Sequence, residues 1–593
     1  MRSYEIETYV NQPPDSLPHD EHGKAERRGF PAKSAAQTAS KSDATGLKLS
    51  DDPTRIDFTL PAGAKLGSAK GTLEVHVNDK AVAWGSASGS SFTGSVAGNK
   101  LAFTGVFTQA GLKLTFKWGA PIAYPFPKMD IYARLDGKPT EWCIPEYHYS
   151  GEKAPEKVEI SSSIIPTCVA IIGDKKQTLA LVPDTDRSWV GLRSDAVVAS
   201  LPLGPEQPSV MLLAAGPGWF SAFRKTVTDV FDFDQPRQFA PVSEAVVELS
   251  RYLLQPSLWS DKYQMLRSFP NTDFFYLFYS LPYAIPAMSY WEEMSGDRTV
   301  SEKIDKILKF TMDRRFATGP MKGAIFSEYG DRKLFDEKAI PYGYSPFYTW
   351  YVNYPNEQLI GMDQGCSRWV TAHTQGALLW SITHVWRARG KAPEAVMDGA
   401  KDLADWMVRF QKEDGSWSYA YDDNGKIVSP MSDSGTIWNI WSLYRFGKLT
   451  GDEKYSKASA KGLEYFKKTF IANHLYRGYW EDIYGGGKTE LNSNQGYEAS
   501  LTTIAMAEMG EREAMVSAAK DGLRFVSTRT LESRNYWTSY GGASEQQGWA
   551  PGTYIAPAFG WAAQKAWRTT GDDIFRRFAG IGKTIGWWMD TSG

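Results

Sequence analysis

A glycine recurs at nearly constant spacing through the C-terminal part of the chain. Gly390, Gly451, Gly510 and Gly571 lie 61, 59 and 61 residues apart, each between two stretches with helical periodicity. Glycine readily takes the left-handed conformation that ends many helices, and an acidic residue suits the first turn of the next one. A repeat of about 60 residues has room for one helical hairpin and a long loop, so the spacing predicts a repeated all-helical architecture.

The same signal occurs once more upstream, at Gly296, 94 residues before Gly390. Each of these glycines is followed by an amphipathic helix, such as residues 396–408, and preceded by a helix that is apolar on more than one side, such as residues 438–446. A helix that is apolar on two sides is buried on both. Five such units, with a helical segment before the first, predict six hairpins in a closed ring, an (α/α)6 toroid. An open α-solenoid is the alternative, but its loops are normally short and regular.

Before this helical region the hydrophobic period is two. Leu73, Val75 and Val77, for example, alternate with polar residues, and clusters of turn-forming residues separate such runs. This pattern predicts half-buried antiparallel strands packed as a β-sandwich. The sequence therefore predicts three parts: a polar N-terminal arm or linker over residues 1–53, a β-sandwich over 54–242, and the toroid over 243–593.

The charge balance argues against two classes of partner. The 66 Lys and Arg residues almost balance the 68 Asp and Glu residues, which leaves a net charge of -2. Without a broad positive field, nucleic acids and anionic membranes are not expected partners. The first residues lack the basic stretch and apolar run of a secretory leader. A cytoplasmic location is therefore expected, with a secreted or periplasmic protein that has lost its leader as the alternative.

The segments before the more apolar helices share a composition. Each carries an acid or an amide, then Gly, then an aromatic residue; they cover residues 362–369, 431–438, 492–498 and 542–551. In a closed ring, the N-termini of the inner helices converge at one mouth, where long loops carry function. The loops from the outer helices repeat these residue types. Together they predict a cleft of carboxylates, amides and aromatic rings.

This combination suits a sugar, because pyranose faces stack on aromatic rings and hydroxyl groups hydrogen-bond to carboxylates and amides. Of the 22 Trp residues, 17 lie after residue 255. For each acid the alternative role is a simple helix N-cap. The candidate catalytic residues are Asp363, Asp433 and Glu545. The candidate substrate-binding residues are Glu328, Arg368, Trp369, His373, Trp438, Trp480, Glu481, Asp482, Gln495, Tyr497 and Trp549.

Two reactions fit these residues. Hydrolysis needs a carboxylic acid to protonate the leaving oxygen and a second carboxylate to activate water or attack the sugar. Elimination at a uronate needs a base such as Tyr497 or His373, and a cation such as Arg368 to neutralise the uronate carboxylate. Carboxylates outnumber basic residues in these loops, which favours hydrolysis. A buried structural role for His373 and a non-catalytic glycan-binding role for the whole protein are further alternatives.

Motifs for other chemistry are missing from the sequence. It contains no dinucleotide-binding glycine motif, no phosphate-binding loop and no helical zinc motif. We therefore expect neither a cofactor nor a metal ion. The expected partner is an oligo- or polysaccharide, and this class includes saccharides that contain uronic acid.

A β-sandwich followed by an (α/α)6 toroid resembles the six-hairpin group of carbohydrate-active enzymes over residues 54–593. This group includes glucoamylase-like hydrolases, unsaturated glucuronyl hydrolases and other glucuronidases, and toroid polysaccharide lyases. Residues 433–455 are similar to the glucuronyl-hydrolase segment in which an Asp opens an inner helix, which implies an acid/base role for Asp433. Glu545 and Gln546 are similar to the glucoamylase region that holds the general base, which implies that role for Glu545.

Overall fold

The structure is a computed structural model of the whole chain. It describes residues 46–579, with the exception of a number of internal segments. These exceptions are residues 62–67, 122–125, 145–146, 152–157, 161–168, 174–176, 184–188, 194, 205–206, 231–251, 269, 332–350, 354–363, 368–369, 475, 477–494, 531–543, 547–549 and 552–554.

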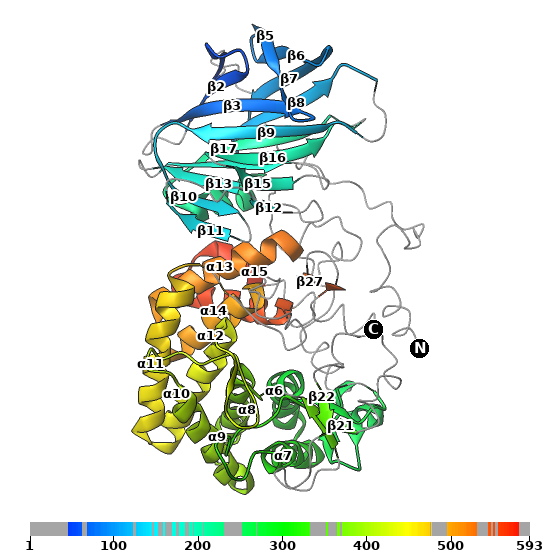
Figure 1. Cartoon of the computed structure of the whole chain (residues 1–593), viewed down its shortest axis with the longest axis vertical. Helices are drawn as coiled ribbons and strands as arrows, with labels where there is room; N and C mark the ends of the chain where they lie inside the picture. Colours follow the sequence, from blue (N-terminus) through cyan, green and yellow to red (C-terminus); the bar gives the residue numbers. More distant parts are fainter. Residues whose placement is uncertain are drawn as a thin grey trace.

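The N-terminal region contains two antiparallel sheets, which lie at one end of the molecule in Figure 1. The eight-stranded sheet consists of β1 (Leu47–Leu49), β2 (Arg55–Leu60), β3 (Ala69–Val77), β9 (Lys128–Leu135), β16 (Ala196–Pro202), β15 (Trp189–Arg193) and β12 (Val158–Ile160) in that order, with β4 (Lys80–Ala81) paired to β3. The nine-stranded sheet consists of β11 (Tyr147–Ser150), β10 (Pro139–Ile144), β13 (Val169–Gly173), β14 (Thr178–Pro183), β17 (Ser209–Ala215), β8 (Leu112–Trp118), β7 (Asn99–Phe107), β6 (Ser91–Val96) and β5 (Ala83–Ser88).

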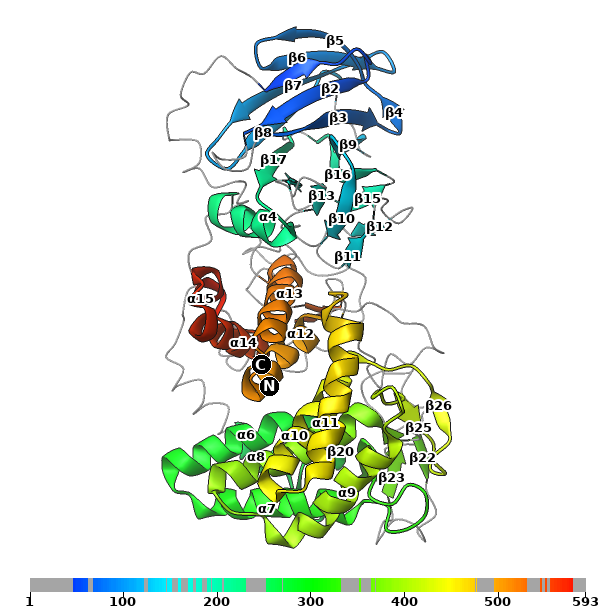
Figure 2. The same ribbon diagram turned by 90° about the vertical axis from the view of Figure 1, so that its left-hand side faces the viewer.

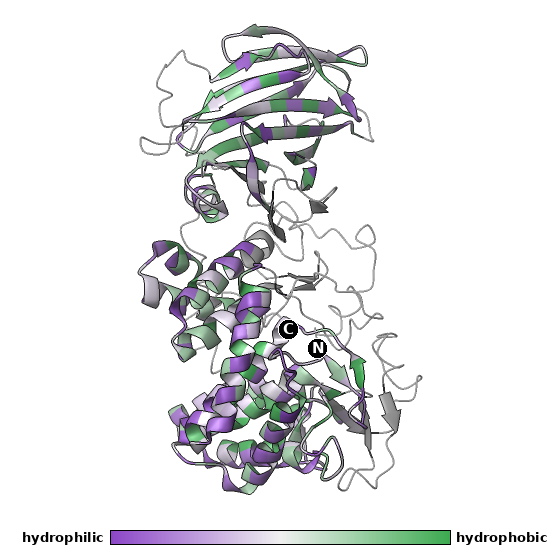
Figure 3. Cartoon of the chain, turned by 60° about the vertical axis from the view of Figure 1, so that its left-hand side comes forward, coloured by the Kyte–Doolittle hydropathy of each residue, from purple (hydrophilic) through white to green (hydrophobic). Residues whose placement is uncertain are grey.

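The period-two pattern forms strands for the expected reason. In β3, Leu73, Val75 and Val77 are buried in a core that also contains side chains of the nine-stranded sheet, while the residues between them are partly exposed. Figure 3 shows the resulting alternation of hydrophobic and hydrophilic residues along the strands. Two antiparallel sheets with a shared core are thus present. Strand β1 pairs with β2 although it lies inside the segment predicted to be an arm.

Strand β17 is buried along its whole length, because both faces of the nine-stranded sheet are covered there. Val210 and Leu212 belong to the core between the two sheets. Met211 and Leu213 belong to a second core, which continues into the helical region and includes helix α4 (Trp219–Lys225). The nine-stranded sheet therefore lies between two hydrophobic cores.

The helical region consists of antiparallel helix pairs. They are α6 (Leu277–Ser295) with α7 (Arg298–Asp313), α8 (Ala372–Arg389) with α9 (Met397–Phe410), α10 (Ile437–Thr450) with α11 (Glu453–Phe466), α12 (Gln495–Met509) with α13 (Arg512–Thr530), and α14 (Ile555–Thr570) with α15 (Asp573–Ala579). The first helix of every pair ends at one of the five predicted glycines, and each of these glycines has φ between 66° and 82°. The prediction of the helix ends is therefore confirmed.

The two helices of a pair differ in burial as the sequence predicts. Helices α8 and α10 are buried on nearly all sides, whereas α7, α9 and α11 bury one face only. The more buried helices lie side by side in the order α6, α8, α10, α12 and α14, which can be followed in Figures 1 and 2. No helix within the described ranges is long and apolar enough to cross a membrane.

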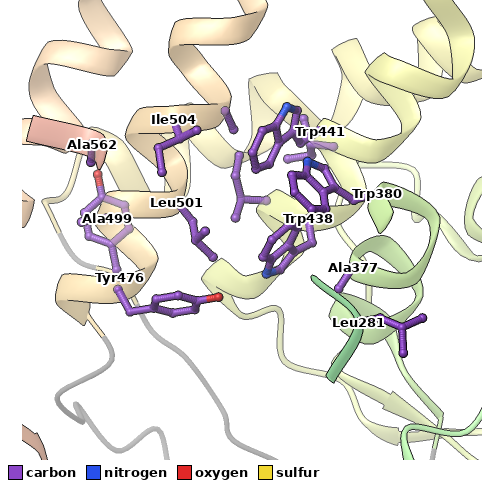
Figure 4. Close-up of a cluster of buried hydrophobic side chains, with 14 of the residues drawn as sticks. Leu281, Ala377, Trp380, Trp438, Trp441, Tyr476, Ala499, Leu501, Ile504 and Ala562 are labelled. Carbon is purple, nitrogen blue, oxygen red and sulfur yellow. The ribbon is translucent and has the colours of Figure 1, made fainter. Parts of the chain in front are cut away.

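A tryptophan cluster fills the space between the buried helices. Trp380 of α8 packs edge-on against Trp438 of α10, with ring centroids 5.3 Å apart, and Trp438 stacks on Trp441 at 5.6 Å. Figure 4 shows these three rings together, with Leu501 and Ile504 of α12 beside them. This packing fixes the positions of α8, α10 and α12, whose N-terminal ends carry the candidate site.

Helices α8 and α10 cross so closely that Gly376 has no room for a side chain. A Cβ atom there would lie 2.3 Å from the backbone nitrogen of Asn439. We expect Gly376→Ala to lower the free energy of unfolding by about 1–3 kcal/mol through overpacking. Gly522 in α13 is the matched control, because its added Cβ would meet nothing closer than 3.7 Å. Gly522→Ala should raise stability by about 0.4–1 kcal/mol. Denaturant unfolding of both variants checks the pair, and equal effects would contradict the close crossing.

Candidate active site

Three buried titratable side chains lie near the N-terminal ends of α8, α10 and α12, three of the more buried helices. His373 is the second residue of α8, Asp433 precedes the short 3-10 helix η7 (Ser434–Thr436) that leads into α10, and Glu498 lies in the first turn of α12. His373, Asp433 and Glu498 are 3%, 1% and 6% exposed, respectively. Ionisable side chains are seldom buried this deeply unless they pair with one another or serve a function.

The Asp433 carboxylate pairs with His373 and does not cap a helix. Its Oδ2 atom lies 3.0 Å from Nδ1 of His373. Asp433 occupies the N-cap position of η7, but its side chain makes no capping hydrogen bond. Instead, the Thr436 hydroxyl donates to the backbone carbonyl of Asp433 at 2.7 Å. The N-cap alternative considered from the sequence therefore does not describe this carboxylate.

The sequence Asp-Ser-Gly-Thr allows the backbone to approach this pair. A Cβ atom at Gly435 would lie 3.0 Å from Oδ2 of Asp433 and 3.2 Å from Cβ of His373. Both contacts are tighter than side chains normally make. Glycine at this position thus leaves just enough space for the carboxylate and the imidazole to lie against η7.

Glu498 has an unusual protonation state for a glutamate. Burial and, to a smaller extent, the negative charge of nearby Asp433 together raise the pKa of Glu498 from 4.5 to about 8, although His373 and a hydrogen bond from Ser434 partly oppose the shift. A carboxyl group with this pKa is mostly protonated at neutral pH. The site therefore combines a neutral carboxylic acid with a charged carboxylate.

Each of the two carboxyl groups has one oxygen atom that is not used by the protein. Within the described part of the chain, Oδ1 of Asp433 and Oε2 of Glu498 are buried and have no hydrogen-bond partner. Leaving such an atom without a partner costs about 1–3 kcal/mol. A water molecule or a bound ligand can supply the missing partner of such an atom.

Three tyrosines lie on the elements that carry or adjoin the cluster. The hydroxyl groups of Tyr497, next to Glu498, and Tyr283 of α6 are hydrogen-bonded to each other. Tyr419 lies before β25 (Ala420–Tyr421), with its ring centroid 5.6 Å from that of His373. Tyr419 is thus the tyrosine of the three whose ring lies beside a member of the cluster.

From the predicted set, the structure brings together Asp433 and His373, whereas the hydroxyl group of Tyr497 bonds to Tyr283 of α6. Trp438 is 2% exposed and belongs to the tryptophan cluster of α8 and α10. For three further predicted residues the structure describes the backbone but not the side chain. Glu328 lies in β21 (Glu328–Asp331), Gln495 is the first residue of α12, and Glu545 lies in β27 (Ser544–Gln546). The remaining predicted residues lie outside the described residues: Asp363, Arg368, Trp369, Trp480, Glu481, Asp482 and Trp549.

The sequence analysis missed Glu498. It lies at the end of the segment 492–498, from which Gln495 and Tyr497 were selected. One signal could have identified it: Glu498 is the only charged residue between Gln495 and Ala507, in a helix that is otherwise apolar or weakly polar. A single charge in the first turn of a helix that is otherwise buried is itself buried, as Glu498 is.

The described residues contain no group of three or more His, Cys, Asp and Glu side chains arranged to hold a metal ion. A neutral acid beside a charged carboxylate can donate a proton with one group while the other accepts a proton or attacks an electrophile.

Comparisons with known proteins give structural similarities only. No protein-family profile and no curated protein sequence matches the chain. Three similar solved structures are a GH76 alpha-mannanase from Bacteroides thetaiotaomicron, a cellobiose 2-epimerase from Bacillus thermoamylovorans and an unsaturated glucuronyl hydrolase from Streptococcus agalactiae. Their identities are 12%, 11% and 12%, and their TM-scores 0.36, 0.42 and 0.37. Each match covers 59% of this chain, and 82%, 87% and 80% of the other chain, respectively.

All three are carbohydrate-active enzymes, the group that the sequence resembles, and the unsaturated glucuronyl hydrolases are one of the families named in that resemblance. With TM-scores below 0.5, these matches do not assign the chain to any one family.

Proposed function

We propose that the protein is a glycoside hydrolase that cleaves an oligo- or polysaccharide, with Glu498 as the general acid and Asp433 as the second carboxylate. The observation that carries the proposal is the buried pair itself, in which Glu498 is protonated at neutral pH beside charged Asp433. Hydrolysis of a glycosidic bond needs two carboxyl groups in these different protonation states.

In the proposed reaction each carboxyl group has its own task. The proton of Glu498 moves to the glycosidic oxygen as the bond between that oxygen and the anomeric carbon breaks, and the oxygen keeps the electron pair. Asp433 either accepts a proton from the water that attacks the anomeric carbon, or attacks this carbon directly. Its Oδ1 atom and Oε2 of Glu498 are available for these contacts, because neither is bound to another described group. The separation of the two carboxyl groups decides between inversion and retention.

The proposal includes the architecture that positions this pair. We take residues 243–593 as a closed (α/α)6 toroid, with the site at the mouth formed by the N-termini of its inner helices, and residues 54–242 as a β-sandwich. The contact between α8, α10 and α12 at His373, Asp433 and Glu498 supports a shared mouth. In this arrangement Asp363 and Glu545 are further candidate acids of the same site.

The test is incubation of the purified protein with a panel of neutral and uronate-containing glycans. New reducing ends without a new ultraviolet absorbance band are the expected result. An absorbance band of an unsaturated uronate would show elimination and would overturn the hydrolase assignment. Binding to a glycan without either product, measured by calorimetry, would show a glycan-binding protein instead. Asp433→Asn is the control variant that should lose the hydrolytic signal.

A further inference from the structure

We propose that Ser434 is a positioning residue that places the acid proton of Glu498 on Oε2, the oxygen atom left for the substrate. The inference deepens the proposed function and rests on it, because it concerns the atom from which Glu498 donates its proton. In this proposal Ser434 does not touch the substrate and transfers no proton in the reaction.

The two oxygen atoms of the Glu498 carboxyl group have different surroundings. The Ser434 hydroxyl group is hydrogen-bonded to this carboxyl group, and the contact lowers the pKa of Glu498, as a donated hydrogen bond does. Oε2 is buried and has no hydrogen-bond partner among the described residues. The hydrogen bond from Ser434 therefore goes to Oε1, and Oε2 is the oxygen atom that a glycosidic oxygen can meet.

The chemistry of a neutral carboxyl group makes this contact selective for one oxygen. Such a group has one O–H donor and one carbonyl oxygen. The carbonyl oxygen is the better acceptor, because the O–H oxygen carries less negative charge. With the Ser434 donor at Oε1, this atom is the carbonyl oxygen and the proton lies on Oε2. Without the donor, the two oxygen atoms would share the proton.

The local fold holds the hydroxyl group in place. Ser434 is fully buried in η7, which packs against α8. A Cβ atom at Gly435 would lie 3.2 Å from Cβ of His373, so the backbone of η7 has little room to move towards α8. The charged and titratable groups that act on Glu498 are Asp433, from the segment before η7, and His373 of α8. Ser434 thus reaches Glu498 from a fixed backbone.

Two substitutions test the donor. Ser434→Ala removes it, whereas Ser434→Thr keeps a hydroxyl group at the same position. The pH above which kcat falls should be higher in the Ala variant, because the donated hydrogen bond lowers the pKa of Glu498. The maximal kcat should be about 10-fold lower or less, since the proton is no longer held on Oε2, and the Thr variant should stay within about 3-fold of the wild type. Looser packing would shift the profile in the opposite direction, because burial is the largest cause of the raised pKa.

A second measurement needs no substrate. At about pH 6 Glu498 is mostly protonated in the folded protein, and its C=O stretching band in the infrared spectrum is the band that Glu498→Gln loses. Titration of this band gives the pKa of Glu498 directly. Its midpoint should lie near pH 8 in the wild type and the Thr variant, and at higher pH in the Ala variant.

The matched control is another buried serine of the same segment. Ser442 of α10 is fully buried, and its hydroxyl group donates to the backbone carbonyl of Asn439 at 3.2 Å. Ser442→Ala also removes a buried hydroxyl group, but one that does not contact Glu498. It should change neither the titration midpoint of the band nor the pH profile of kcat.

The outcomes are distinguishable. A midpoint that does not move in Ser434→Ala would show that the hydroxyl group only packs, and a midpoint at lower pH would contradict the direction of the hydrogen bond; both overturn the proposal. If Ser434→Ala does not fold, Ser434→Cys decides, because the thiol is a weak donor of similar size and should give a smaller shift in the same direction. If Glu498→Gln is fully active, the proposed function fails, whereas the infrared titration still tests the contact with Ser434.

Discussion

Glu498→Gln should lower kcat by at least about 100-fold, because the amide has the shape of the neutral acid but no proton to donate. In the wild type, kcat should also fall above about pH 8 as Glu498 loses its proton, since burial raises its pKa to about 8. The measurement is a pH–rate profile with the substrate identified in the glycan panel. An unaltered kcat in the variant would remove Glu498 from the mechanism.

The same substitution has a consequence for stability that requires no substrate. The Glu498 side chain loses its proton near pH 4.5 in the unfolded chain, and near pH 8 in the folded protein. Between these values the folded state holds the extra proton, so the unfolding free energy falls as the pH rises, by up to about 1.4 kcal/mol per pH unit. Glu498→Gln should abolish this fall and be the more stable protein at pH 9. Glu513→Gln, on the exposed side of α13, is the control and should leave the pH dependence unchanged.

Asp433→Asn should also lower kcat by about 100-fold or more, with little change in the midpoint of thermal unfolding. The amide is nearly isosteric with the carboxylate, so it fits the same space beside His373, whose Nδ1 lies 3.0 Å from Oδ2 of Asp433. The substitution removes the negative charge and the basic oxygen that hydrolysis needs. Kinetics and thermal unfolding of the same preparation are the two measurements.

The control for Asp433 is an aspartate whose role is a helix cap. Asp452 accepts a hydrogen bond from the backbone of Lys454 at 3.0 Å and caps α11. Asn is an equally good cap, so Asp452→Asn should leave both kcat and stability nearly unchanged. If both variants were fully active, Asp433 would have no catalytic role, and the predicted acids Asp363 and Glu545 would become the next candidates.

Much of the helical region follows from local sequence. The five glycines that end the first helix of each pair could be predicted, because a left-handed residue at a helix end is a local requirement that glycine meets best. The alternation of apolar and polar residues in β3 could also be predicted, because the strand has one buried face. Strand β1 was not predicted, because three residues in a polar segment carry too little pattern and depend on pairing with β2.

The candidate site could be predicted only in part, because its decisive contacts join distant segments. Asp433 looked equally suited to a cap, and only its contact with His373, 60 residues earlier, shows where the carboxylate points. Glu498 was overlooked because its protonation depends on burial and on the charge of Asp433, which no local pattern encodes. Sequence placed the residues at helix starts, and tertiary packing determined their chemistry.

The complete burial of β17 has a consequence for how the two halves of the molecule depend on each other. Alternate residues of this one strand belong to two different cores, with Leu212 in one and Leu213 in the other. The division of the chain near residue 242 therefore does not coincide with a division between hydrophobic cores. A fragment limited to the helices would expose the apolar surface that Met211, Leu213 and Trp219 normally cover, and the sheets alone would expose the opposite side of the same contact. The nine-stranded sheet thus contributes side chains to both cores, which couples the cooperative unfolding of one half to that of the other.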